Sequence, residues 1–181
     1  MNRGSPPLSH WKPWLDDLAK DKPHQLADRI AALFHEKSMT GAAAWNRLFD
    51  ETIASLRFTV DGEELTLELT LNKLQDSDGE IRRKAAEALS TVFRKELRIF
   101  ALITNTLAKD KEISDRWRKF EDVADSRHLA NRVEREVVDA LVAAVREAYP
   151  RLSHRYYRLK ARWFGREELD FWDRNAPLPQ V

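Results

Sequence analysis

One apolar stripe, longer than any other in the 181-residue chain, limits what this sequence can fold into. It recurs every three or four positions, at Ile81, Ala85, Ala88, Leu89, Val92, Phe93, Phe100, Ile103 and Leu107. This spacing places the side chains on one face of an α-helix. Asp78, just before the stripe, is a residue type that caps helix N-termini. The stripe predicts a helix of about eight turns, roughly 45 Å long, and an all-α, multi-helix, bundle-like fold around it.

Shorter stripes of the same period predict further helices, at about residues 23–39, 40–56, 66–74, 133–148 and 151–164. Thr40 and Thr66 are the predicted N-caps of the second and third of these helices, and Gly165 is the predicted stop after the last. The predicted inward face of the last helix consists of Leu152, Tyr156, Leu159 and Trp163. Residues 113–131 keep no sustained period, so they are predicted to connect helices through short helical turns.

The only strand signal predicts one small β-hairpin near residues 56–66. Leu56, Phe58 and Val60 alternate with polar residues, and Asp61-Gly62 follows them. That dipeptide favours a primed turn, in which both central residues have positive φ. The hairpin is the one interruption that we expect in the helical fold.

The prolines indicate where the helical body begins and ends. Three of the seven prolines lie in residues 1–13 and two lie near the C-terminus. We predict an irregular lead-in over residues 1–13, a single helical domain over 14–169 and an irregular tail over 170–181.

The composition excludes several classes of function. The 31 basic and 30 acidic residues nearly cancel, so no overall field attracts nucleic acid or membrane, and neither is expected as a partner. The absence of cysteine excludes disulfides, thiolate metal sites and a cysteine nucleophile. No apolar run reaches about 18 residues, and the N-terminus has no signal-peptide core. The expected location is the cytoplasm.

A zinc-hydrolase motif is the first candidate for catalytic chemistry. In H-E-x-x-H, two histidines one helical turn apart bind zinc and the glutamate activates water. The chain has His35 and Glu36, but Met39 stands at the second ligand position, where a thioether suits catalytic zinc poorly. We therefore interpret His35 as an ordinary histidine at a helix end and assign no metal residue.

A second candidate is the acidic group of Glu121, Asp122, Asp125 and His128. Asp125 and His128 have the spacing of one arm of a helical di-metal site, but no second arm exists in the sequence. The alternative is that the carboxylates cap neighbouring backbone, and we prefer it.

A third candidate is the basic stripe of Arg151, Arg155, Arg158 and Arg162, which lies among aromatic residues. Such a stripe can hold phosphates and stack bases. The alternative is that the arginines extend over apolar surface or pair with acidic neighbours such as Glu167. With balanced net charge, nucleic-acid binding remains the weaker interpretation.

Five segments in order carry a resemblance to the oligoendopeptidase F family: HEKSMTG (35–41), VDGEELTL (60–67), ITNTLAKDKE (103–112), ADSRHLANRV (124–133) and YPRLSHRYY (149–157). The resemblance runs from about Trp11 to Pro179. It implies a parent enzyme like thimet oligopeptidase, a zinc metallopeptidase that cuts short peptides in a channel between helical lobes.

The resemblance covers a middle segment of the family, before its H-E-x-x-H helix. The family's zinc ligands, general-base glutamate and transition-state groups lie downstream and have no match here. No catalytic residue, metal ligand or cofactor is therefore carried over to this chain, and zinc is implied only for the full-length family member. The same resemblance implies that this piece supplies channel wall and scaffold, and that it is inactive alone.

The channel contacts that we predict combine polar and aromatic groups beside apolar stripes: Arg127, His128, Asn131, Tyr156 and Tyr157. The alternative is that Arg127 and Asn131 only tie a connection to the long helix. The implied ligand is an oligopeptide bound by the parent enzyme, and the implied partner is the missing catalytic half or a second copy. Apolar side chains are expected to be exposed at Trp11, Trp14, Phe171, Trp172 and Leu178.

A different class of function stays open beside the peptidase interpretation. The chain then is a non-enzymatic helical interaction module, whose apolar stripe meets a partner protein. Both interpretations predict the same fold and differ in what completes it.

Overall fold

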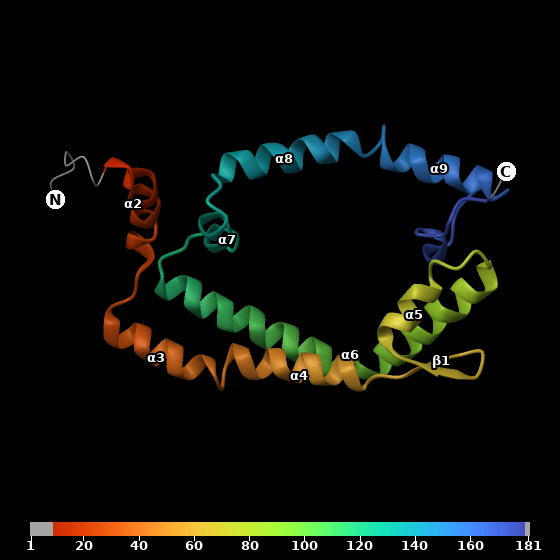
Figure 1. Ribbon diagram of the computed structural model, residues 1–181, viewed down its shortest axis with the longest axis horizontal. Helices are drawn as coiled ribbons and strands as arrows, with labels where there is room; N and C mark the ends of the chain where they lie inside the picture. The colour runs from red at the N-terminus through yellow and green to blue at the C-terminus, as the bar shows by residue number, and fades with distance from the viewer. Residues whose placement is uncertain (1–8, 180–181) are drawn as a thin grey trace. The chain divides into compact units, whose positions relative to one another are not determined.

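The computed structural model describes residues 9–179, and it is helical apart from one two-stranded antiparallel sheet (Figure 1). The α-helices are α2 (Lys12–Ala19), α3 (Asp28–Ser38), α4 (Ala42–Ser55), α5 (Leu67–Lys73), α6 (Gly79–Trp117), α7 (Asp125–Ala130), α8 (Arg135–Ala148) and α9 (Ser153–Trp163). The strands are β1 (Phe58–Val60) and β2 (Glu63–Leu65), and the 3-10 turns are η1 (Lys22–His24) and η2 (Phe171–Asp173). The predicted all-α fold with one small hairpin is confirmed.

The chain divides into two compact units. One consists of Met1–Ala44 with Thr106–Ala143, and the other of Trp45–Asn105 with Ala144–Val181. The predicted boundaries of the lead-in and the tail stay a prediction, and their outer parts, residues 1–8 and 180–181, lie outside the described residues.

The long helix α6 is longer than its stripe predicts. It has 39 residues, about 58 Å at 1.5 Å per residue, and continues to Trp117 through a segment predicted as a connection. Ion pairs one turn apart support these last turns, because Glu112 binds both Lys109 and Arg116. At the other end, Asp78 Oδ1 accepts a hydrogen bond of 2.8 Å from the Glu80 amide, as predicted for the cap.

The core of the second unit lies where the hairpin packs on the first half of α6. Phe58 is fully buried and packs with Leu56 and Leu89. The rings of Phe58 and Phe93 are 5.7 Å apart. A neighbouring buried cluster contains Val60, Leu65 and Ala85. The apolar side of the hairpin therefore covers the predicted stripe.

Two of the predicted local signals are confirmed. Asp61 and Gly62 have φ of 52° and 82°, so both central residues of the hairpin turn have positive φ. Thr66 caps α5, because its hydroxyl accepts a hydrogen bond from the Leu69 amide.

The prediction that Thr40 caps α4 is wrong. Its hydroxyl donates to the Lys37 carbonyl at 3.3 Å, and α4 begins only at Ala42. The Lys37 carbonyl at the end of α3 accepts this bond together with bonds from the amides of Thr40 and Gly41, so Thr40 belongs to the end of α3 and not to the start of α4.

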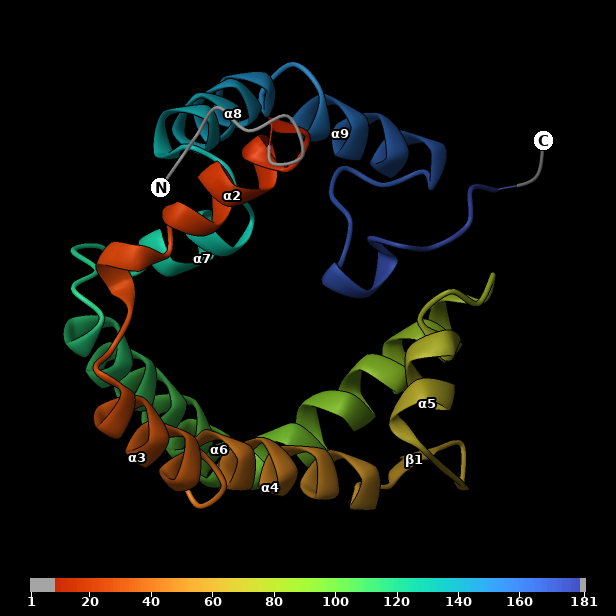
Figure 2. The ribbon, with the colours of Figure 1, turned by 60° about the vertical axis from the view of Figure 1, so that its left-hand side comes forward.

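In the first unit, α3 lies beside the last turns of α6 (Figures 1 and 2). The rings of Phe34 and Trp117 are 6.0 Å apart in an edge-on contact. His24 stacks on Phe120 at 4.0 Å, and its Nδ1 lies 2.8 Å from the Arg118 carbonyl oxygen. These ring contacts connect the N-terminal segment to the end of α6.

The predicted inward face of α9 is wrong. The side chains expected inside are 40–65% exposed, namely Leu152, Tyr156, Leu159 and Trp163. The buried residues of this helix are instead Lys160 and Ala161. The reason is that the C-terminal segment covers this narrow side of α9 and offers carbonyl oxygens to Lys160.

Gly62→Val should lower the free energy of unfolding by about 1–3 kcal/mol, because a β-branched residue is strained at positive φ. A Cβ at Gly62 would meet no atom within 4 Å, so the cost comes from backbone strain alone. The matched control is Gly62→Asn, because asparagine tolerates this conformation. Urea denaturation measures both, and equal stability of the two variants would contradict the turn geometry.

Candidate functional site

The predicted channel contacts form two local groups. Arg127 and His128 lie on α7, and Asn131 is its C-cap. Arg127 and Asn131 are exposed, whereas His128 is half-buried. Tyr156 and Tyr157 are neighbours on α9, with their rings 5.4 Å apart and edge-on. The first group belongs to the first unit and the tyrosines belong to the second, and a role in peptide contact stays a prediction for all five.

Two carboxylates of the acidic group at the start of α7, Asp122 and Asp125, are paired and cap neighbouring backbone. Asp122 accepts a hydrogen bond from the Ala124 amide, and Asp125 accepts one from the Asp122 amide. Arg135 lies 3.3 Å from Asp122 and 2.7 Å from Asp125. The bond from Arg135, with that from the Asp122 amide, lowers the pKa of Asp125. Within residues 9–179 no group of three or more histidine, cysteine or acidic side chains can hold a metal ion.

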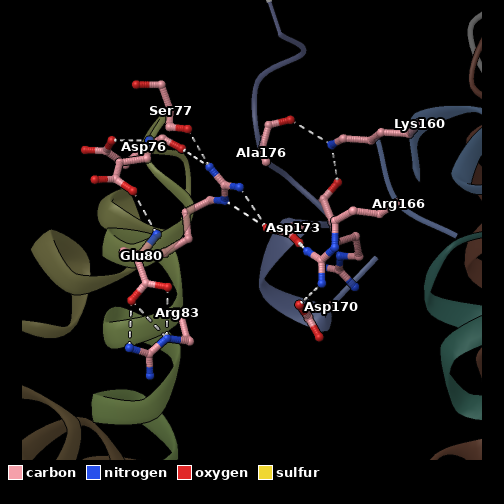
Figure 3. A network of polar contacts seen from close by, with 12 residues as sticks. Asp76, Ser77, Glu80, Arg83, Lys160, Arg166, Asp170, Asp173 and Ala176 are labelled. Atoms are coloured by element: carbon pink, nitrogen blue, oxygen red, sulfur yellow. Dashed lines mark hydrogen bonds and ion pairs between the residues drawn. The ribbon is translucent and has the colours of Figure 1, made fainter. Parts of the chain in front are cut away.

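A buried cluster of charges in the second unit is the most organised polar site of the described chain (Figure 3). Asp173 on η2 is 1% exposed and accepts bonds from Arg82 Nε and Nη2, at 3.2 and 2.8 Å, on one carboxylate oxygen. Its other oxygen accepts a bond of 2.7 Å from Arg166. Arg82, itself 3% exposed, also donates to the carbonyls of Asp76 and Ser77. A buried arginine is thus paired and almost fully hydrogen-bonded.

Lys160 adds a third cation to this cluster. Its side chain is buried, and Nζ donates to the carbonyls of Arg174 and Ala176 at 2.9 and 2.7 Å. The Phe164 ring lies 5.8 Å from both Lys160 Nζ and Arg82 Cζ, within the range of a cation–π contact. Two buried cations therefore lie near the same aromatic ring, and one of them, Arg82, is paired with the buried carboxylate of Asp173.

Burial and the positive charge of Arg82 lower the pKa of Lys160, although Asp173 partly opposes this. For Arg166 the direction is opposite, because its bond with Asp170 raises the pKa of the guanidinium. The cluster thus holds Arg166 charged and makes the charge of Lys160 costly.

The cluster was not predicted from the sequence, although one signal was present. Arg82 lies three, four and seven positions before the buried residues Ala85, Ala86 and Leu89, which places a cation on the apolar face of α6. A charged residue on such a face requires a partner. Nothing in the sequence identifies Asp173, 91 positions away, as that partner.

A pocket of about 620 Å³ lies beside the cluster, between α9 and the segment that Asp173 anchors. Aromatic and aliphatic side chains line it, among them Leu74, Tyr157, Phe171 and Trp172. Arg158 and Arg174 also line it, and no hydrogen bond or ion pair of the described residues involves either guanidinium group. The pocket contains one predicted contact, Tyr157.

The comparisons agree with the resemblance seen in the sequence. A family model described as Oligopeptidase F matches residues 4–58. The chain is 26% identical over 184 residues to group B oligopeptidase PepB of Streptococcus agalactiae, and the match covers 97% of this chain. It is 24% identical over 170 residues to oligopeptidase PepF of Bacillus subtilis, a match that covers 91% of this chain. The chain is thus similar in sequence to proteins of the oligopeptidase F family, and the family model matches its first third.

The fold of the chain is similar to that of solved oligoendopeptidase structures as well. It matches the crystal structure of oligoendopeptidase-F from Enterococcus faecium with a TM-score of 0.82 and 22% identity, over 97% of this chain. That match covers 36% of the Enterococcus chain, and the sequence matches cover 30% of PepB and 25% of PepF. The chain thus spans about a third or less of these relatives.

Asp173→Asn should lower the free energy of unfolding by about 3–5 kcal/mol, because it leaves the buried Arg82 without its carboxylate. The control is Asp170→Asn, which removes a partly exposed partner of Arg166 and should cost about 1 kcal/mol or less. Urea denaturation monitored by circular dichroism measures both variants. Equal losses would contradict the assignment of Asp173 as the centre of the cluster.

The lowered pKa of Lys160 predicts a pH dependence. Above its folded-state pKa, Lys160 loses its proton in the folded chain, while the unfolded chain still binds it. The free energy of unfolding should therefore rise with pH between the folded-state and the unfolded-state pKa of Lys160. Below both pKa values, the full cost of burying the charged ammonium group remains. Lys160→Met should remove this rise relative to the unaltered chain. If the free energies of unfolding of the two chains change in parallel between pH 7 and 10, the prediction is wrong.

Proposed function

We propose that the chain is the non-catalytic helical part of an oligopeptidase F-type zinc peptidase, supplying wall and scaffold for the channel that binds short peptides. The observation that carries this proposal is the match of 97% of the chain to 36% of an oligoendopeptidase-F structure. The same match supports a missing catalytic part as the partner. Arg127, His128, Asn131, Tyr156 and Tyr157 are the proposed peptide contacts.

Exposed apolar side chains support a place within a larger protein body. Trp11, Trp14, Phe171 and Leu178 are 48–70% exposed, as expected, whereas Trp172 is half-buried. A further exposed stripe lies along α8, where four side chains are 41–63% exposed: Val137, Leu141, Val142 and Val145. A continuous apolar face of this kind is typical of a surface that another element covers.

Chemistry supports the non-catalytic role. The sequence contains no pair of histidines at the spacing of H-E-x-x-H, so catalytic zinc would be held by other residues of the complete enzyme.

None of the helices within residues 9–179 combines the length and apolarity needed to cross a bilayer. We place the activity of the complete enzyme in the cytoplasm.

A non-enzymatic interaction module is the second candidate. The exposed stripe of α8 favours it, because an amphipathic helix with one free apolar face can dock into a groove of another protein. In that case short peptides would not bind, whereas the peptidase proposal requires peptide contact.

The chain alone should hydrolyse no quenched-fluorescent peptide, with or without added zinc, because it lacks the zinc-binding pair. Measurable hydrolysis that a zinc chelator abolishes would contradict the non-catalytic role.

Short peptides should nevertheless bind weakly, with shifts in the amide NMR signals of α7 and α9. Arg127→Gln should weaken this binding, because an exposed guanidinium group is a strong donor to peptide carbonyls and carboxylates. Arg146→Gln is the control, because Arg146 is an exposed arginine on a different helix, α8. Absence of any shift, or equal effects of the two variants, would favour the interaction module.

A further inference from the structure

We propose that the pocket between α9 and the η2 segment binds the carboxyl end of a peptide whose last side chain is apolar. This inference rests on the proposed function, because it names the part of a peptide that the chain recognises. Four features carry it: two unpaired cations, two unpaired acids, an aromatic wall and a rigid base.

The cations determine the charge of the ligand. Arg158 comes from α9 and Arg174 follows η2, so separate segments bring two arginines to one pocket. Three arginines of this unit are in ion pairs, Arg82 with Asp173, Arg83 with Glu80, and Arg166 with Asp170 and Asp173, whereas Arg158 and Arg174, like several exposed arginines of the unit, have no ion pair among the described residues. Arginine binds carboxylates through two parallel hydrogen bonds, so these two groups favour a carboxylate ligand.

The acids determine what stands next to that carboxylate. Glu167 and Glu168 line the same pocket, and no hydrogen bond or ion pair found among residues 9–179 involves their carboxylates. A simple anion would be repelled by them. The end of a peptide instead carries amide N–H groups close to its carboxylate. The glutamates can accept hydrogen bonds from those N–H groups.

The wall determines the side chain. Phe171 is 70% exposed, and Tyr157, Trp172 and Leu74 line the pocket with it. The volume of about 620 Å³ lies within the range of small-molecule sites and admits one or two residues of a peptide. An apolar C-terminal side chain would cover this exposed surface.

The charge cluster gives the pocket its rigid base. Asp173 follows Phe171 and Trp172 directly, and its bonds to Arg82 and Arg166 hold this segment in place. The two carbonyl bonds of Lys160 hold the next residues, including the backbone of Arg174. The aromatic wall and one of the two cations are therefore positioned before a ligand arrives, which reduces the entropy lost on binding.

An N-acetylated pentapeptide that ends in phenylalanine tests the proposal. Its free-acid form and its C-terminal amide form are each titrated into the full chain, and binding is measured by NMR. The free acid should bind at least about tenfold more tightly than the amide, because hydrogen bonds to a charged group are stronger than those to a neutral one. N-acetylphenylalanine forms the second arm. A free acid of this size should bind more weakly than the pentapeptide, and equal affinity would assign the pocket to a small organic acid instead of a peptide.

Arg158→Gln and Arg174→Gln should each remove most of the preference for the free acid. Arg155→Gln is the matched control, because it lies on the same helix, is exposed and does not line the pocket. Neither pocket arginine has a side-chain partner among residues 9–179, so both variants should keep the melting temperature of the unaltered chain. Equal binding of acid and amide, or an equal loss with Arg155→Gln, would overturn the pocket assignment. Peptide binding that shifts only α7 would overturn it while leaving the proposed function intact, and absence of all peptide binding would overturn both.

Discussion

The second unit depends on the ion pair between Arg82 and Asp173, two buried residues 91 positions apart. Removing two charges from water costs several kcal/mol for each ion, so such a pair persists only when almost every donor and acceptor is satisfied. Here that condition is met by Arg166, by two backbone carbonyls of the turn before α6, and by the Phe164 ring. The start of α6 and the C-terminal segment are thereby joined through polar contacts instead of an apolar core.

This arrangement explains why so few side chains of α9 are buried. The helix contacts the C-terminal segment through Lys160 and Ala161, while its aromatic residues remain exposed. Those aromatic residues and the arginines beside them are then available for a ligand or for other parts of a larger protein. A rigid polar base with an exposed aromatic and cationic surface is a suitable arrangement for recognition, since the cost of ordering the surface is met during folding.

Local patterns predicted most of the fold. The stripe from Ile81 to Leu107, the Asp61-Gly62 turn and the Thr66 cap all depend on neighbours within a few residues, and each is confirmed. The prediction of the buried face of α9 failed because the segment that covers the helix is short, contains proline and shows no periodic apolar pattern. The charge cluster was missed for a related reason: Arg82 is recognisable on its stripe, but pairing across 91 positions is a property of tertiary structure.

The similarity to oligopeptidase F proteins and the charge cluster support the account proposed above, in which a scaffold part holds a preformed surface for peptides. Its most direct test is hydrogen exchange at the Asp173 and Ala176 amides, which donate to the carbonyls of Asp170 and Asp173. If the cluster anchors this segment, both amides exchange as slowly as the core amides of the β1–β2 hairpin. Exchange at the rate of an unstructured peptide would show that the segment opens freely, and would contradict the account.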